Sequence, residues 1–446
     1  MGKVIKIKKG KNINLVGEAP KEIKGKIESA TYAVKPTDFV GVVPKMEVKP
    51  GAEVKAGTPL FHDKANESIK FTSPVSGEVV DVVRGERRAI LEVKILADKE
   101  TSYEDFGSAD LSSSSREDVV SKLKASGLWP SLRQRPFNTI ADSEEDPKAI
   151  FISGFNSGPL AANVDFTLAE NLADFNAGIE VLQKLTSGKI HLGLDAGNKG
   201  ILEAAEGVEK HYFSGPHPAG LVGIQIHHID PINKGEVAWT VKPVHVAWIG
   251  RLFSTGKYDT TQRIAIGGSE VPNPGYFETV SGCSLENVLE SLNSDNVRTI
   301  SGDVLTGTAI DRAGYLGFYD DQVTVIPEGD DYEFLGWLIP TYSRPTISNT
   351  FPISKFLKKK FKVNTNMHGE ERAFVVTGQY EKVLPMDILP VQLLKSIMAQ
   401  DFEKMENLGI YEVVEEDLAL CEFVCTSKIE VQKILREGLD LMKEEG

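Results

Sequence analysis

Residues 215–231 carry the sequence GPHPAGLVGIQIHHIDP near the middle of the chain. Pro216, Pro218 and Gly220 disfavour regular structure in the first part of this stretch. The apolar residues 221–229 that follow are too few for a helix to be preferred, and they favour one buried strand. A glycine- and proline-rich loop beside a strand is typical of the sheet edge where open α/β sheets bind ligands. The stretch therefore predicts a ligand-facing loop followed by a strand.

Three histidines, His217, His227 and His228, lie in this stretch. Catalytic and structural metal sites need three or four ligands that converge on the ion. Only His227 and His228 are adjacent, and side chains of adjacent residues in a strand point to opposite faces. The sequence therefore predicts no metal site at these histidines.

The chain before this loop alternates between strand and helix patterns. Strands are predicted at residues 149–153, 189–194 and 211–214, and helices at residues 168–185 and 201–206. Such alternation indicates an α/β domain with a parallel sheet and crossover helices.

The turn after the first of these strands, GFNSGP at residues 154–159, has the glycines of a phosphate loop. It lacks both the G-x-G-x-x-G pattern and the G-K-S/T ending, which are the patterns that place backbone amides around a pyrophosphate. A tight turn between strand and loop is therefore favoured over a nucleotide site.

The composition is that of an ordinary globular protein. The chain has 446 residues, of which 41% are hydrophobic and 26% charged, and its length predicts about three domains. It contains no continuous apolar run of the ~18 residues that a membrane-spanning helix needs. Its first residues alternate apolar side chains with lysines and form no apolar signal core, so we expect a cytoplasmic protein.

The net charge of −14 argues against nucleic acid as a partner, because that binding needs a concentrated positive surface. One basic run, KFLKKKFK at residues 355–362, carries enough positive charge to bind phospholipid or an acidic partner protein. A charge cluster exposed to solvent is the favoured interpretation. The three cysteines are too few for a disulfide framework and suit a reducing compartment.

Residues 35–96 form a small β module with two quasi-repeats of strand and turn. The pattern resembles the barrel-sandwich fold of lipoyl and biotinyl carrier domains, in which a hairpin presents the modified lysine. That hairpin position falls on Asn66, and Lys64 is two places away. Because a swinging arm needs its attachment amine, the module is predicted to be structural or to serve in docking.

The second half of the chain begins with a mixed pattern. Strands are predicted at residues 263–267, 276–280 and 297–302, with a helix at residues 284–292. These elements fit a small mixed sheet with one helix packed across a face.

The end of the chain is predicted to be helical. One amphipathic helix is predicted at residues 390–408, and a last helix starts at Ser427, which forms a capping box with Glu430. Cys421 and Cys425 precede that helix. Two thiolates alone cannot complete a tetrahedral zinc site or hold a four-iron cluster.

Four features together resemble the NqrA family, the A subunits of the sodium-translocating NADH:quinone reductase, across essentially the whole chain. They are the stretch at 215–231, the β module without its lysine, GLWPSLRQRPF at 127–137 and CEFVCTSK at 421–428. That family is similar in turn to the NADH-binding flavoprotein subunit of complex I and to the C subunit of the Rnf complex.

The resemblance implies four domains in a multidomain α/β chain. It places N-terminal strands and a lipoyl-like barrel-sandwich module at residues 1–97 and a Rossmann-like α/β domain at 98–255. A β-grasp (SLBB) domain at 256–335 and a helical C-terminal domain at 336–446 follow.

The departures from the related proteins imply that two cofactors are absent. Where those proteins bind flavin with open backbone amides, this chain has Trp129, Pro130 and Arg133. Their iron–sulfur motif has four cysteines, whereas the same register here gives two cysteines preceded by a glutamate and a leucine: Glu415, Leu418, Cys421 and Cys425. No flavin, iron–sulfur cluster, metal or covalently bound cofactor is therefore expected.

The resemblance implies a peripheral subunit on the cytoplasmic face of the bacterial inner membrane. It would dock on the integral membrane subunits of a complex that couples NADH oxidation and quinone reduction to sodium export. It would also hold a quinone such as ubiquinone, and the cofactor-binding residues expected for that pocket are Trp129, Arg133 and His217. No catalytic residue is assigned.

Three alternatives stay open at this point. His217 would cap neighbouring backbone and Trp129 would fill the vacated flavin space if no quinone binds. The whole chain would be a free-standing flavin- or NAD-dependent oxidoreductase if it held nucleotide. It would be a purely structural adaptor if it held no ligand.

Overall fold

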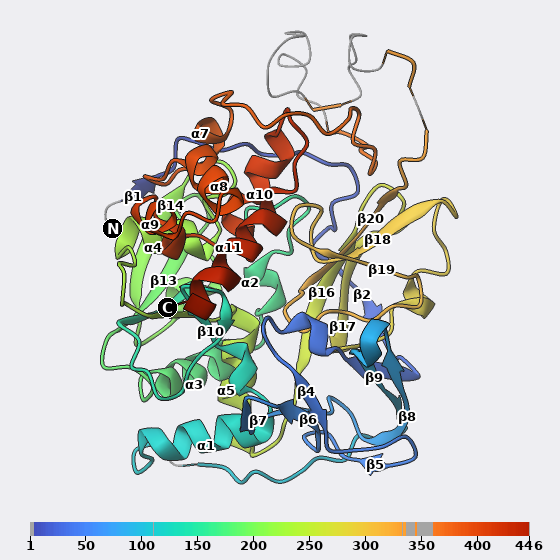
Figure 1. Cartoon of the computed structure of the whole chain (residues 1–446). Helices are drawn as coiled ribbons and strands as arrows, with labels where there is room; N and C mark the ends of the chain where they lie inside the picture. The colour runs from blue at the N-terminus through green and yellow to red at the C-terminus, as the bar shows by residue number, and fades with distance from the viewer. Residues whose placement is uncertain (1–3, 110, 332, 336–343, 346–359, 446) are drawn as a thin grey trace.

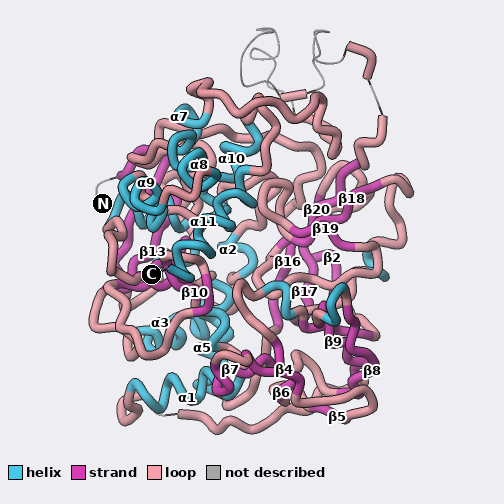
Figure 2. Tube along the Cα trace, viewed as in Figure 1, coloured by secondary structure: helices cyan, strands magenta, loops and turns pink. Residues whose placement is uncertain are grey.

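The computed structural model describes residues 4–109, 111–331, 333–335, 344–345 and 360–445 (Figure 1). Most of the predicted basic run, residues 355–359, lies outside the described residues. Figure 2 shows most helices on one side of the molecule and the strands of the mixed sheet on the other.

A seven-stranded sheet forms the centre of the α/β part, in the order β1-β14-β13-β12-β15-β10-β11. The strands that pair in parallel are β1 (Val4–Lys6), β14 (Glu209–Ser214), β13 (Lys189–Asp195), β12 (Ala149–Ser153) and β15 (Ala238–Thr240). Two antiparallel strands, β10 (Arg133–Arg135) and β11 (Thr139–Ile140), complete one edge. The predicted parallel sheet and its three central strands are confirmed.

Helices cover both faces of this sheet. Ile150 and Ile152 of β12 belong to the core that includes α3 (Leu172–Leu182) and α5 (Pro243–Thr255). These two helices approach closely because Gly178 has no Cβ, which would collide with the Val246 carbonyl oxygen. On the other face, Phe151 packs with Ile226 of α4 (Val222–Ile229). The sheet is therefore wound on both sides.

The predicted strand at 221–229 is wrong, because these residues form α4. One side of α4 contacts the sheet through Ile226, and another contacts the C-terminal helices through Ile224. A helix buried on two sides is apolar around most of its surface and loses the periodicity that distinguishes it from a buried strand. The helix predicted at 201–206 is also shorter, since only the 3-10 turn η4 (Ile201–Ala204) forms.

The N-terminal module consists of two small antiparallel sheets. The first contains β3 (Thr31–Val34), β9 (Ile90–Ala97), β8 (Gly77–Arg84) and β5 (Glu53–Val54), and the second β4 (Pro44–Met46), β6 (Pro59–Asp63) and β7 (Asn66–Thr72). Asn66 opens β7 directly after the turn at Lys64 and Ala65, so the predicted hairpin is confirmed.

A mixed six-stranded sheet lies beside the module, in the order β19-β18-β20-β16-β17-β2. Its strands are β19 (Thr308–Ile310), β18 (Val297–Ser301), β20 (Gln322–Pro327), β16 (Thr261–Gly267), β17 (Gly275–Val280) and β2 (Ile23–Lys26). The predicted strands are confirmed. The helix predicted at 284–292 is wrong in extent, because only the 3-10 turn η5 (Glu286–Val288) forms.

The N-terminal segment joins two sheets outside the barrel-sandwich module. β1 pairs with β14 of the α/β sheet, and β2 pairs with β17 of the mixed sheet. The segment thereby fastens the α/β part to the mixed sheet.

Short helices connect these parts. They are α1 (Arg116–Ser126), α2 (Val164–Thr167), and the 3-10 turns η1 (Pro36–Asp38), η2 (Glu86–Arg88) and η3 (Trp129–Ser131). Ser115 caps α1 through a capping box with Asp118.

The C-terminal region is helical, as predicted. It contains α7 (Tyr380–Val383), α8 (Pro390–Met398), α9 (Phe402–Asn407), η6 (Ile410–Glu412), α10 (Glu415–Val424) and α11 (Val431–Glu445). The single helix predicted at 390–408 is two helices, because Gln400 adopts a left-handed conformation with φ 53° between them.

The last helix begins later than predicted. α11 starts at Val431, and the hydroxyl of Ser427 donates to the Ala373 carbonyl in place of a capping box. Lys428 between them has φ 58°, which interrupts a helical start at Ser427. The predicted cap is therefore wrong because a distant segment takes the hydroxyl.

Candidate functional site

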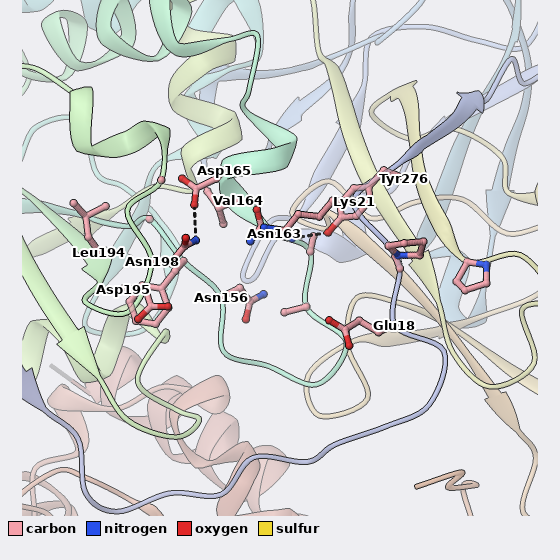
Figure 3. Close-up of a pocket in the computed structure, with 18 of the residues that line it drawn as sticks. Glu18, Lys21, Asn156, Asn163, Val164, Asp165, Leu194, Asp195, Asn198 and Tyr276 are labelled. Atoms are coloured by element: carbon pink, nitrogen blue, oxygen red, sulfur yellow. Dashed lines mark hydrogen bonds between the residues drawn. The ribbon is translucent and has the colours of Figure 1, made fainter. Parts of the chain in front are cut away.

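A cavity of 650 Å³ opens at the carboxyl ends of β12 and β13 (Figure 3). β12 lies between β13 and β15. The chain continues from β12 to β13 on one side and adds β15 later on the other side. Open α/β sheets bind ligands at such a switch point. The lining residues come from the N-terminal segment, the loops after both strands, the mixed sheet and the chain beyond that sheet: 17–21, 154–156, 161–165, Leu194, Asp195, Asn198, Gly200, Pro274, Tyr276 and Lys360.

The polar groups of this cavity are largely paired with one another. Figure 3 shows Asp165 and Asn198 on one wall and Tyr276 on the other. Asn198 Nδ2 donates to Asp165 Oδ2 at 3.1 Å, and the Asn163 amide donates to the Tyr276 hydroxyl at 2.8 Å. Lys360 Nζ lies 2.6 Å from Glu18 Oε2.

These residues do not fit a phosphate-bearing flavin. Glu18, Asp165 and Asp195 contribute three carboxylates against two lysines, Lys21 and Lys360, and Lys360 is already paired with Glu18. In the glycine turn after β12, the Gly158 amide donates to the side chain of Asn156 at 2.8 Å. Phosphate binding requires free amides and an excess of positive charge, whereas carboxylates outnumber lysines in this cavity.

His217 is buried in the loop before α4 and holds three segments together. Its Nδ1 lies 3.1 Å from Ser157 Oγ, and its backbone amide donates to Asn12 Oδ1 at 2.8 Å. Its carbonyl accepts from the Lys11 amide at 2.8 Å. Burial lowers the pKa of His217 to about 4, so the imidazole is neutral at pH 7.

Trp129 and Arg133 have separate surroundings. Trp129 is fully buried, donates from Nε1 to the Ala141 carbonyl at 2.8 Å, and meets Trp239 edge to face. The Arg133 guanidinium lies 4.8 Å from the centre of the Tyr319 ring. Among the described residues it has no hydrogen-bond acceptor.

An ionic cluster links β10, the strand that carries Arg133, to α10. Arg135 Nη1 lies 2.9 Å from Asp417 Oδ2, and Arg135 Nη2 lies 2.6 Å from Glu416 Oε1. Burial raises the pKa of Glu416, but the charges of Arg135 and, to a smaller extent, Arg133 outweigh it and lower that pKa. The charge of Glu416 in turn raises the pKa of His217, against the larger effect of burial. Arg133 and His217 thus share an electrostatic neighbour. This cluster was not predicted from the sequence, because 281 residues separate Arg135 from Glu416 and no local pattern pairs them.

Cys421 and Cys425 are packed into the C-terminal core, and burial raises the pKa of Cys421 far above its ordinary value. Of the other two positions in the cluster register, Leu418 is fully buried, and Glu415 lies 2.7 Å from Arg436. These four residues do not fit an iron–sulfur cluster, because only two carry thiols and one fills the core with an alkyl group.

Three metal-ligating side chains converge on neighbouring strands at a different place. His191 of β13 stands opposite Glu209 of β14, and His211 lies two residues further along β14 on the same face. One ligand atom from each lies within 4.8 Å of the others. This group was not predicted from the sequence. The sequence places all three residues in or beside predicted strands. Only the parallel register of β13 and β14 shows that they are neighbours.

His227 and His228, two of the histidines considered for metal binding, have different hydrogen-bond partners. His227 and His228 lie on α4, with ring centres 5.2 Å apart. His227 Nδ1 lies 3.0 Å from Glu412 Oε2, whereas His228 Nδ1 lies within its own helix, 2.9 Å from the Ile224 carbonyl. The prediction that they point to opposite faces of a strand is wrong.

No helix in the part of the chain that the structure describes is both long and apolar enough to cross a bilayer. The barrel-sandwich module, the doubly wound sheet with its switch-point cavity, the β-grasp (SLBB) sheet and the C-terminal helices define a multidomain α/β protein built on a Rossmann-like centre. Three family models match it. They are the NqrA N-terminal barrel-sandwich hybrid domain at residues 5–98, the NqrA second alpha/beta domain at 114–258 and the NQRA C-terminal domain at 263–312.

The chain belongs to the NqrA family, the A subunits of the Na⁺-translocating NADH-quinone reductase. It is 40% identical to the family member of Neisseria meningitidis serogroup B, over 99% of this chain and 100% of that protein. It is 38% identical to that of Vibrio parahaemolyticus and 40% identical to that of Serratia proteamaculans, with the same coverage. An NAD⁺-reducing NiFe hydrogenase covers 77% of this chain at 12% identity, with a TM-score of 0.37, too low to bear on function.

Proposed function

We propose that this chain is a peripheral subunit of a sodium-translocating NADH:quinone reductase, held on the cytoplasmic face of the inner membrane by integral membrane subunits. The observation that carries this proposal is the match over 99% of the chain to proteins named as the A subunits of that reductase. A match of this extent supports the same place in the same assembly.

The chain contributes no flavin and no iron–sulfur cluster to the electron path. The carboxylates of the switch-point cavity and the buried Leu418 in the cluster register support this part of the proposal. Electrons would therefore pass between groups held by the other subunits.

We also propose that the chain holds a quinone head group near Arg133 and His217. A quinone presents two carbonyl acceptors on an apolar ring and needs one or two donors in an apolar pocket. The Arg133 guanidinium has donors to offer beside the Tyr319 ring. If the Ser157 hydroxyl donates to His217 Nδ1, the proton of the neutral imidazole sits on Nε2 and is available to the second carbonyl. Trp129 is fully buried and would contribute to the core beside this pocket, with no direct contact with the quinone.

Assembly is tested by purifying the chain with the proteins bound to it from detergent-solubilised membranes. We expect integral membrane subunits in constant ratio and NADH-driven quinone reduction that needs this chain. Recovery of the chain alone, with bound flavin and its own NADH oxidation, would favour a free-standing oxidoreductase instead.

The quinone pocket is tested with a photoreactive quinone analogue on the assembled complex. We expect label on peptides that contain Arg133 or His217, and less label after Arg133→Leu. A matched control is Arg298→Leu, which removes an arginine paired with Glu328 on the mixed sheet. Label confined to the membrane subunits would reject the pocket and leave a purely structural adaptor.

A further inference from the structure

We propose that His191, Glu209 and His211 bind a divalent transition-metal ion of the zinc class at the edge region of the seven-stranded sheet. The three side chains project from β13 and β14 on one face, and nothing in the proposed function uses them. The site therefore goes beyond the role in quinone reduction.

The spacing of the ligand atoms fits such an ion. Zinc binds imidazole nitrogen and carboxylate oxygen at ~2.0–2.2 Å in tetrahedral geometry, which puts ligand atoms roughly 3.3 Å apart. His191 Nδ1 lies 2.9 Å from His211 Nε2 and 3.7 Å from Glu209 Oε2. These two separations bracket the required one, and the atoms of the third pair, Glu209 and His211, lie within 4.8 Å of each other, so side-chain rotation must close the site.

The ligand set selects the class of ion. Two imidazoles and one carboxylate suit Zn²⁺, Co²⁺ or Ni²⁺, whereas Ca²⁺ and Mg²⁺ prefer oxygen ligands throughout.

Neighbouring side chains hold the His191 ring in place, and the Glu209 side chain is open to solvent. The His191 ring lies 4.8 Å from that of Phe151, which fixes its position in the sheet. The Glu209 side chain is 45% exposed, so a fourth ligand from solvent has an entry path. Lys189 Nζ lies 2.9 Å from Glu209 Oε2, but its side chain is 70% exposed and can swing away when an ion arrives.

The test uses the full chain without an affinity tag, stripped with a chelator and titrated with Zn²⁺ by calorimetry. We expect one ion per chain and a rise of several degrees in the thermal unfolding midpoint. Co²⁺ should give the visible absorption of a site with nitrogen and oxygen ligands, without the thiolate charge-transfer band that Cys421 or Cys425 would add.

Two variants assign the ion to this site. Glu209→Gln keeps the shape of an exposed side chain and His211→Gln keeps much of its volume, and we expect each to weaken Zn²⁺ binding at least tenfold. His228→Gln, on the surface of α4, is the matched control and should bind as the original chain does. Absence of stoichiometric binding, or equal affinity in Glu209→Gln, His211→Gln and the original chain, would overturn the proposal.

Discussion

The Arg135–Glu416–Asp417 cluster joins strand β10 to helix α10, and the His191–Glu209–His211 cluster lies on β13 and β14 of the same sheet, in an opposite environment. Arg135 is 2% exposed and Asp417 1%, because the C-terminal helices cover them. Glu209, in contrast, has a side chain that is 45% exposed, and its only ion pairs within the described chain are with Lys189 and His191.

The difference teaches how the two clusters are used. Arg135 and Asp417 are removed from water and must stay paired, whereas the Glu416 side chain is half-buried, so the first cluster fixes the C-terminal helices to the sheet. Ligating atoms at the surface can exchange partners at low cost, so the second is open to an ion from solution. The Asp417 carboxylate also packs directly against α4, because a Cβ at Gly223 would collide with it.

The largest effect is expected from Arg135→Leu. It leaves the buried Asp417 and the half-buried Glu416 without their cation, and we expect a loss of about 3–5 kcal/mol in the free energy of unfolding. Denaturant titration measures it. Arg298→Leu breaks a more exposed pair and should cost less than about 1 kcal/mol. Similar losses in both variants would show that the buried cluster does not fasten the C-terminal helices.

The next effect concerns pH and His217. Its pKa falls from 6.5 in the unfolded chain to about 4 in the folded one, so the unfolded chain binds more protons between these values. Stability should therefore be full above pH 6.5 and decline as the pH falls toward 4, by at most about 3 kcal/mol from this group.

His217→Gln should flatten that part of the stability curve. His245, whose pKa burial lowers to about 3, is present in both proteins, so the difference isolates His217. Unfolding midpoints measured from pH 4 to 7 test this. Parallel curves for the two proteins would contradict a neutral, buried His217.

A smaller effect is expected from replacing Cys421 and Cys425 with alanine together. Both thiols pack as small apolar groups, and we expect a loss of about 2 kcal/mol in stability. NADH-driven quinone reduction by the assembled complex should be unchanged. A normally assembled complex that no longer transfers electrons would assign these thiols to the electron path.

The smallest effect is expected from Lys189→Met. The variant breaks an exposed ion pair and should change stability by less than about 1 kcal/mol. It also frees the Glu209 carboxylate, so Zn²⁺ affinity should rise. Weaker Zn²⁺ binding in this variant would contradict competition between Lys189 and the ion.

Strand periodicity predicted much of the fold because the central strands are buried and have clear boundaries. β12 matches residues 149–153, and β13 and β14 differ from prediction by one or two residues. The pattern failed at α4, where burial on two sides made a helix as apolar as a strand. It failed again at Gln400 and Ser427, where a left-handed residue and a distant carbonyl set the helix ends.

The sites were less predictable because long-range pairing builds them. His217 was singled out for its loop, yet its contacts with Asn12 and Ser157 depend on how the N-terminal segment crosses the sheet. The parallel register that sets His191 opposite Glu209 is likewise a property of the folded sheet.

The proposal that this chain has a structural and ligand-binding role without a redox centre is tested most directly by cofactor analysis. The chain is separated from its purified complex under conditions that keep it folded, and its flavin, iron and acid-labile sulfide are quantified. We expect each to be far below one per chain, with all of the flavin and iron recovered in the other subunits. One flavin or one iron–sulfur cluster per chain would contradict the proposal.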